Sequence, residues 1–202
     1  IIVEEGPLKT SSDFKMLESE AYPALYQDSA SRQTADKAIK ILQGRCVGGS
    51  TTVNWTSSFR TPPATLQWWQ TAHGLKNLSV DAMAPWFAAM EQRLHVGLWP
   101  LPPNDNNAAL ARGAAQLGIP VAVIPRNVKM CWNLGYCGLG CPTNAKQSML
   151  LTTIPAALTR GATLISRLRA EKLEFSGNKA VALEALALKP DGLRPSGIRI
   201  SL

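Results

Sequence analysis

The sequence lacks several features that would assign it to a definite class of protein. No apolar run reaches the roughly 18 residues that a membrane-spanning helix requires, so we expect no transmembrane segment. Internal repeats and low-complexity tracts are absent. The four cysteines are too few for a disulfide scaffold. The formal net charge is +7, but the basic residues are scattered and form no long run, so we expect no nucleic-acid partner.

The hydrophobic content of the chain is sufficient for a globular protein with a hydrophobic core. Hydrophobic residues make up 46% of the 202 positions, which suits one large domain or two small ones. The opening residues 1–5 predict a buried strand with Glu4 at its carboxyl end, closed by a Gly-Pro turn. Residues 162–202 predict three or four strands joined by "SGN" and "PDG" turns.

Helical spacing appears between these two ends of the chain. Residues 79–94 predict a helix capped by Ser79, and residues 108–117 predict another that begins at Asn106 or Asn107. An apolar stripe on the first helix is typical of core packing and consists of Met83, Trp86, Phe87 and Met90. Helices and strands alternate without a regular βαβ rhythm, so we predict a mixed α/β (α+β) fold.

The stretch "GRCVGGSTTVNW", Gly44–Trp55, is the most unusual local feature. Two adjacent glycines let the backbone approach a ligand closely, and the hydroxyl residues that follow them donate hydrogen bonds to phosphates or a ring edge. A β-bulge or tight corner explains the same glycine pair. Spacing alone leaves both interpretations open, because neither G-x-G-x-x-G nor a Walker pattern is present.

The longer stretch "GRCVGGSTTVNWTSSFR" resembles the first signature of the glucose-methanol-choline (GMC) family of flavin oxidoreductases. "VEEGP", "PPNDNNAAL", "GCPTNAKQSML", "TTIPAAL" and "RGATL" occur in the family's usual order, so the resemblance covers nearly the whole chain. It implies a partial FAD-binding, Rossmann-like domain with part of the substrate region. Residues 1–60 would then bind FAD, 61–130 would lie on the substrate side, and 131–202 would carry a Cys-rich loop and return to the FAD-binding domain.

The resemblance also implies a role for each matching residue. Glu4 would accept hydrogen bonds from the adenosine ribose, and Ala170 would contact adenine through its backbone. The predicted contacts to the pyrophosphate and flavin are Gly48, Gly49 and Ser50. Those predicted for the isoalloxazine side are Asn54, the backbone of Trp55, and Ser57.

No catalytic residue is expected within these 202 positions. In the family, the glycine-rich dinucleotide turn precedes the ribose acid, and the catalytic histidine lies far toward the C-terminus. His73 and His95 have no matching context, so we expect them to be surface or helix-end residues. The resemblance therefore predicts a fragment that, alone, lacks a complete FAD pocket and the catalytic pair.

Three cysteines form a second candidate site. The spacing Cys131-x5-Cys137-x3-Cys141 does not match common zinc knuckles, whereas thiolates in a Gly-rich loop can wrap an iron–sulfur cluster. One branch of the family, whose members pass electrons to a cytochrome partner, carries a three-iron cluster at a similar loop. A Cys137–Cys141 disulfide, or buried free thiols, are the alternatives that stay open.

The resemblance predicts that the parent protein oxidises a CH–OH group of an alcohol, sugar or sterol by hydride transfer to flavin. A truncated non-catalytic remnant and a cysteine-dependent metal or redox module are the alternatives. The sequence does not identify the substrate or the electron acceptor. A bacterial origin is implied, with the periplasm and the cytoplasm both open.

Overall fold

The computed structural model describes residues 1–192 and 194–202 and divides into two compact units. One unit combines Ile1–Trp55 with Met130–Leu202, and the other is Thr56–Lys129. The two ends of the chain therefore fold together, and the middle forms a unit of its own. The functional assignment of residues 1–60, 61–130 and 131–202 stays a prediction.

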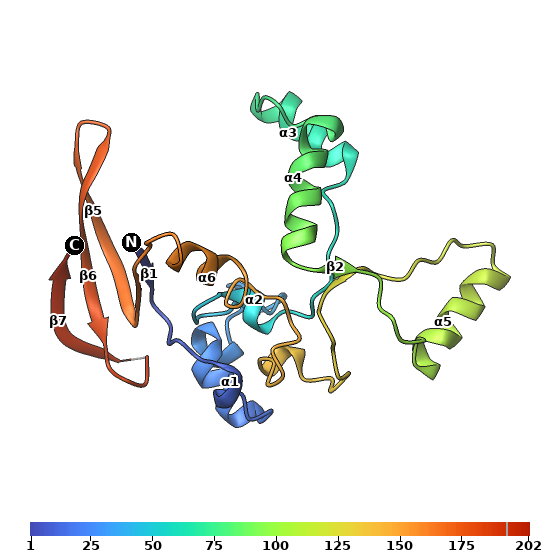
Figure 1. The fold of residues 1–202 in the computed structure, drawn as a ribbon, viewed down its shortest axis with the longest axis horizontal. Helices are drawn as coiled ribbons and strands as arrows, with labels where there is room; N and C mark the ends of the chain where they lie inside the picture. Colours follow the sequence, from blue (N-terminus) through green and yellow to red (C-terminus); the bar gives the residue numbers. More distant parts are fainter. Residues whose placement is uncertain (193) are drawn as a thin grey trace. The chain divides into compact units, whose positions relative to one another are not determined.

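The unit formed by the chain ends mixes helices and strands, as predicted (Figure 1). Its helical segments are η1 (Ser11–Asp13), α1 (Glu18–Leu25), η2 (Gln27–Ala30), α2 (Ser50–Val53), η3 (Cys137–Leu139) and α6 (Thr153–Leu158). Its strands are β1 (Ile2–Glu4), β4 (Leu164–Ser166), β5 (Leu168–Ser176), β6 (Lys179–Leu188) and β7 (Pro195–Ser201). The predicted opening strand is present but only partly buried, and the three or four strands predicted for the C-terminal residues are observed as four.

Two small sheets organise this unit. β1 pairs in parallel with β4, so that Glu4 lies opposite Ser166. β5, β6 and β7 form an antiparallel meander, which Figure 1 shows as a long twisted hairpin followed by a third strand. The backbone N–H of Arg167 donates to the carbonyl of Gly6 at 3.1 Å, which ties the start of the meander to the end of β1.

A compact hydrophobic cluster lies beneath the glycine-rich stretch. Its buried members are Phe14, Ala21, Leu25, Tyr26, Cys46, Val53 and Leu139. The Tyr26 hydroxyl donates to the carbonyl of Gly138 at 2.6 Å, and a side chain at Gly140 would overlap the Phe14 ring. The cluster therefore packs the cysteine-rich loop against the segment that follows Gly44.

The middle unit is mainly helical. It contains α3 (Pro63–His73), α4 (Val80–Arg93), β2 (Val96–Gly97), α5 (Asp105–Gln116) and β3 (Arg126–Asn127). The Ser79 hydroxyl caps α4 as predicted, by accepting from the backbone N–H of Ala82 at 3.2 Å. Among the residues described, no helix is both long and apolar enough to cross a membrane.

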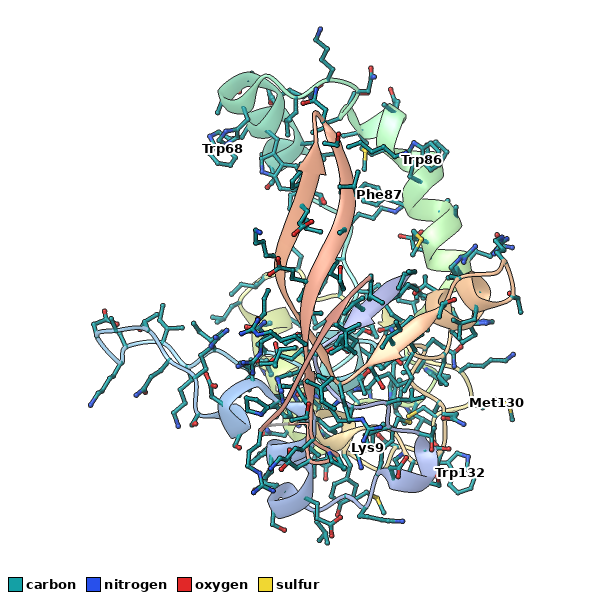
Figure 2. The ribbon with its side chains drawn as sticks, turned by 90° about the vertical axis from the view of Figure 1, so that its left-hand side faces the viewer. Lys9, Trp68, Trp86, Phe87, Met130 and Trp132 are labelled. Carbon is teal, nitrogen blue, oxygen red and sulfur yellow. The ribbon has the colours of Figure 1, made fainter. Side chains whose placement is uncertain are left out.

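Two predictions for this unit were wrong. The cap of α5 is Asn104, whose Oδ1 accepts from the N–H of Asn107 at 2.9 Å, and the predicted caps lie inside the first turn. Asn104 has the extended backbone and the side-chain acceptor of an N-cap residue, so the helix begins at Asp105, earlier than predicted. The apolar stripe on α4 is not buried core, because Trp86 is 69% exposed; Figure 2 labels this residue and Phe87.

Candidate functional site

The carboxylate of Glu4 is fixed where β1 ends. Its Oε1 accepts the backbone N–H of Gly6 at 2.7 Å. Partial burial raises the pKa of Glu4, against the lowering effects of the Gly6 N–H and the charge of Arg45, while Glu5 raises it further. A half-buried carboxylate held at a strand end has its second oxygen available to accept from hydroxyl groups.

The glycine pair forms the turn that starts α2. Gly48 has φ +92°, and Gly49, the residue before α2, has φ +55° and ψ −145°, a conformation that is essentially restricted to glycine. These glycines lie in no strand, so the β-bulge alternative does not describe them. A tight corner describes them, and the ligand contact at this turn stays a prediction.

The two glycines differ in what surrounds them. A Cβ atom on Gly48 would lie 2.5 Å from Thr52 Oγ1 and 3.0 Å from Leu150 Cβ, so Gly48 is packed inward. A Cβ atom on Gly49 would have no atom within 4 Å, leaving aside its neighbours in the chain. Gly49 therefore presents bare backbone to open space.

Hydrogen bonds hold this turn from several sides. The Gly49 N–H donates to the Cys46 carbonyl at 2.7 Å, and the hydroxyl of Ser50 accepts from the Gly44 N–H at 2.9 Å. Because a hydroxyl both accepts and donates, Ser50 retains its own proton for a ligand. The Thr51 hydroxyl donates to the Gly48 carbonyl at 2.5 Å.

The residues predicted for the flavin side fall in two units. Asn54 and Trp55 directly follow α2, and both side chains are exposed. Trp55 borders the cysteine-rich loop, since a Cβ atom on Gly138 would lie 3.3 Å from Trp55 Cζ2. Ser57 lies in the other unit, where it bridges Arg126. The structure thus brings Asn54 and Trp55, but not Ser57, into one unit with the glycine turn.

Ala170 lies on β5 opposite Ala185, at a point where the register of the β5–β6 pair shifts. Its neighbour Arg169 donates from Nη2 to Glu5 Oε1 at 2.9 Å, and Arg45 donates from Nε to the same oxygen at 3.0 Å. Arg45 also donates to the Gly192 carbonyl. Sequence reasoning missed this ion-pair network, although a second acid after the strand and the arginine of "GRCVGG" were its visible signals.

Replacing Glu5 with Gln should destabilise the protein by about 1–3 kcal/mol, because it removes the charge that compensates a buried guanidinium. The Arg45 side chain is only 7% exposed. Chemical denaturation measures the loss. Asp28→Asn is the matched control, since Asp28 pairs with Arg32 on the surface, and it should change stability little. Equal, small effects of the two variants would contradict the assignment.

Of the alternatives left open for the cysteine-rich loop, the structure shows free thiols, which are partly and not fully buried. All four are free thiols, so the Cys137–Cys141 disulfide is not formed. Among residues 1–192 and 194–202, no group of three His, Cys, Asp or Glu side chains could hold a metal ion. The sulfurs of Cys131 and Cys141 instead accept backbone N–H groups, from Asn133 and Lys146 respectively, each at 3.4 Å. The structure therefore gives no support to a cluster at Cys131, Cys137 and Cys141.

The thiols are expected to differ in reactivity. Burial raises the pKa of Cys46 to about 12, so it stays protonated through pH 9. For Cys141, burial acts to raise the pKa, but hydrogen bonds from the Thr143 hydroxyl and nearby backbone N–H groups outweigh it and lower the pKa. Iodoacetamide should therefore label Cys141 well before Cys46 between pH 7 and 9, as followed by peptide mass spectrometry. Labelling of Cys46 first, in folded protein, would contradict this order.

The two histidines lie at helix ends, as predicted. His73 is the last residue of α3 and packs edge-on against Trp68, with ring centroids 4.8 Å apart. His95 follows the end of α4. Neither belongs to the unit that contains Glu4 and the glycine turn.

The chain is similar in sequence to known oxidoreductases. Residues 22–194 match the family profile described as GMC oxidoreductase. An uncharacterised GMC-type oxidoreductase of Mycobacterium tuberculosis is 32% identical over 195 residues, covering 95% of this chain and 31% of that protein. A long-chain-alcohol oxidase of Arabidopsis thaliana is 28% identical over 180 residues, covering 89% of this chain and 24% of the oxidase.

Among solved structures, pyridoxine 4-oxidase from Mesorbium loti shares the fold. The TM-score is 0.63 at 17% sequence identity, over 99% of this chain and 42% of that one. This chain thus spans only 24–40% of the length of the first curated relatives that it matches. The mixed helix and strand fold predicted from the sequence is confirmed as that of the N-terminal region of such oxidoreductases.

Proposed function

Because the chain belongs to the GMC oxidoreductase family, we propose that it forms the FAD-binding part of a longer flavin-dependent oxidoreductase. One observation carries the proposal: the backbone of Gly49 is bare on its open side, in the same unit as the strand-end carboxylate of Glu4. When bound, FAD would accept a hydride from a CH–OH group of the substrate. The residues present fit this cofactor in chemical type.

Each part of the site has a distinct task in this proposal. Glu4 accepts hydrogen bonds from ribose hydroxyls, because its carboxylate is already oriented by Gly6. Gly49 lets the backbone lie close to the cofactor, and the Ser50 hydroxyl donates to it. Asn54 and Trp55 would line the isoalloxazine side, and the backbone of Ala170 would contact adenine.

The substrate that we propose is an alcohol, a sugar or a sterol. Two of the relatives are named long-chain-alcohol oxidases, which supports a substrate with a CH–OH group. Neither His73 nor His95 has the sequence context of the family's catalytic histidine, so we propose that the catalytic base comes from another part of the protein. The flanking reading frame tests this directly. It should encode G-x-G-x-x-G upstream of this chain and the family's histidine downstream.

Anaerobic mixing of the full-length gene product with primary alcohols, sugars and pyridoxine tests the activity. One of these substrates should bleach the blue absorption band of the flavin. A protein that binds FAD but is bleached by no CH–OH compound would support the non-catalytic alternative.

An electron relay through an iron–sulfur cluster stays a prediction from the sequence. In the described structure the three thiols do not form a metal-holding group, so no step of the proposed reaction passes through them. Iron and zinc analysis of the full-length gene product tests the point. Stoichiometric iron with a paramagnetic signal would establish the cluster, and the absence of both metals would leave oxygen, a cytochrome or a soluble carrier as acceptor.

A further inference from the structure

Lys146 is a buried cation at the centre of the unit that holds the candidate site. Its side chain is only 2% exposed. The Nζ atom donates to three backbone carbonyls: that of Thr52 at 2.9 Å, that of Asn54 at 2.6 Å and that of Cys137 at 2.6 Å. An ammonium group has three donors and no acceptor. These three carbonyls therefore match its full donor capacity.

Two of the three acceptors lie at a helix end that needs an external partner, and the third lies in the cysteine-rich loop. Carbonyl groups at the C-terminal end of a helix have no partner within it, and Thr52 and Asn54 lie at that end of α2. The Asn54 carbonyl belongs to the peptide that joins Asn54 to Trp55, the two residues proposed for the isoalloxazine side. Cys137 belongs to the cysteine-rich loop, whose Gly138 borders the Trp55 ring.

The chain after Lys146 also packs beneath the glycine turn. The Met149 N–H donates to the Thr51 hydroxyl at 3.0 Å, and the Cβ atom of Leu150 would lie 3.0 Å from a Cβ atom added to Gly48. We call residues 146–150 the floor segment. The floor segment contacts both ends of α2. Leu150 lies near Gly48 at its start, and Lys146 binds the Asn54 carbonyl at its end.

We propose that Lys146 is a positioning residue for the cofactor site: its ammonium fixes the Asn54–Trp55 peptide and joins it to the cysteine-rich loop. The inference rests on the proposed FAD site and goes beyond it, since it assigns a role to a residue that makes no predicted cofactor contact. Burying an ammonium is costly unless all its protons are paired. Its three carbonyl acceptors satisfy this condition and, in turn, orient three peptides.

Substitution of Lys146 in the full-length gene product tests the role. Lys146→Met removes all three donors. Lys146→Arg keeps the charge, but its N–H donors lie in one plane and cannot point at the three carbonyls as those of a compact ammonium do. Lys172→Met is the matched control, since Lys172 is 63% exposed and lies on β5. The readouts are the FAD dissociation constant, the visible circular dichroism of the bound flavin and its midpoint potential.

We expect Lys146→Met to weaken FAD binding by roughly tenfold or more, by analogy with the loss of residues that orient the ligands of a bound metal, and to change the visible dichroism. Lys146→Arg should show a smaller change in the same direction, and Lys172→Met none. A lower melting temperature with unchanged affinity, dichroism and potential would reduce Lys146 to a structural role and overturn the proposal. If Lys146→Met does not fold, a Lys146→Arg protein with wild-type flavin properties would overturn it equally.

Measurements on the wild-type protein distinguish a failure of the proposed role of Lys146 from a failure of the proposed FAD-binding function. A wild-type gene product that carries no flavin would overturn the proposed function and the role of Lys146 together. A wild-type protein that binds FAD, beside a Lys146→Met variant with unchanged flavin properties, would overturn the role of Lys146 alone.

Discussion

Replacing Gly49 with valine should leave the full-length gene product with little or no bound FAD. Gly49 has φ +55° and ψ −145°, a conformation that costs a side-chain-bearing residue about 1–3 kcal/mol. The added side chain would also fill the open space through which the cofactor approaches. The strain lowers stability, whereas the side chain in the cofactor's path weakens FAD binding; a loss of about 1.4 kcal/mol of binding free energy is a factor of ten in affinity, and we expect a loss of about tenfold or more. Flavin absorbance per polypeptide after purification measures the loss.

Gly161→Val is the control for backbone strain at this position. Gly161 also has a positive φ, +88°, and lies in the same unit, and a Cβ atom added to it would meet no atom within 4 Å. This variant should lower stability and leave FAD content unchanged. If Gly49→Val retained its FAD, or if both variants lost it equally, the glycine turn would not be the place of cofactor approach.

Replacing Gly6 with alanine should strongly destabilise the chain-end unit. A Cβ atom at Gly6 would lie 2.5 Å from the Cys46 nitrogen and closer still to the Arg45 carbonyl, so two backbones would have to separate. Overpacking of this kind costs about 3 kcal/mol at the upper end of its usual range, a large fraction of a typical stability of about 5–15 kcal/mol. Chemical denaturation of the soluble protein measures the change.

Gly113→Ala is the opposite case and serves as the control. Gly113 lies within α5 and has open space where a Cβ atom would be. Alanine should therefore stabilise that helix by about 0.5–1 kcal/mol. A Gly6→Ala protein as stable as wild type would show that Gly6 and the Arg45–Cys46 backbone do not pack as described.

The parts of the site that could be predicted from the sequence are those determined by local chemistry. A β-branched run ending in an acid predicted β1 and the place of Glu4 at its end, and the glycine pair predicted a sharp change of backbone direction, which is observed as the turn before α2. The cap at Ser79 was equally local, since it depends on a hydroxyl placed three residues before its donor. In each of these cases the determining atoms lie within a few residues of one another.

The parts that were missed depend on contacts between distant segments. Lys146 reaches Asn54 across 92 positions of sequence, and Arg169 reaches Glu5 across 164. Gly6 and Gly44 look like ordinary turn glycines, although each packs against another backbone. The apolar stripe on α4 showed which face of the helix is apolar, but not whether another segment covers that face. The spacing of the cysteines did not predict correctly whether their side chains meet in the described structure.

The ratio of FAD to polypeptide in the purified full-length gene product tests the central claim most directly. Flavin released by denaturation is measured by its absorbance, and the metal content is measured on the same sample. We expect a yellow protein with about one FAD per chain. A colourless protein containing stoichiometric zinc would contradict it and would assign the cysteine-rich loop, not the glycine turn, as the functional site.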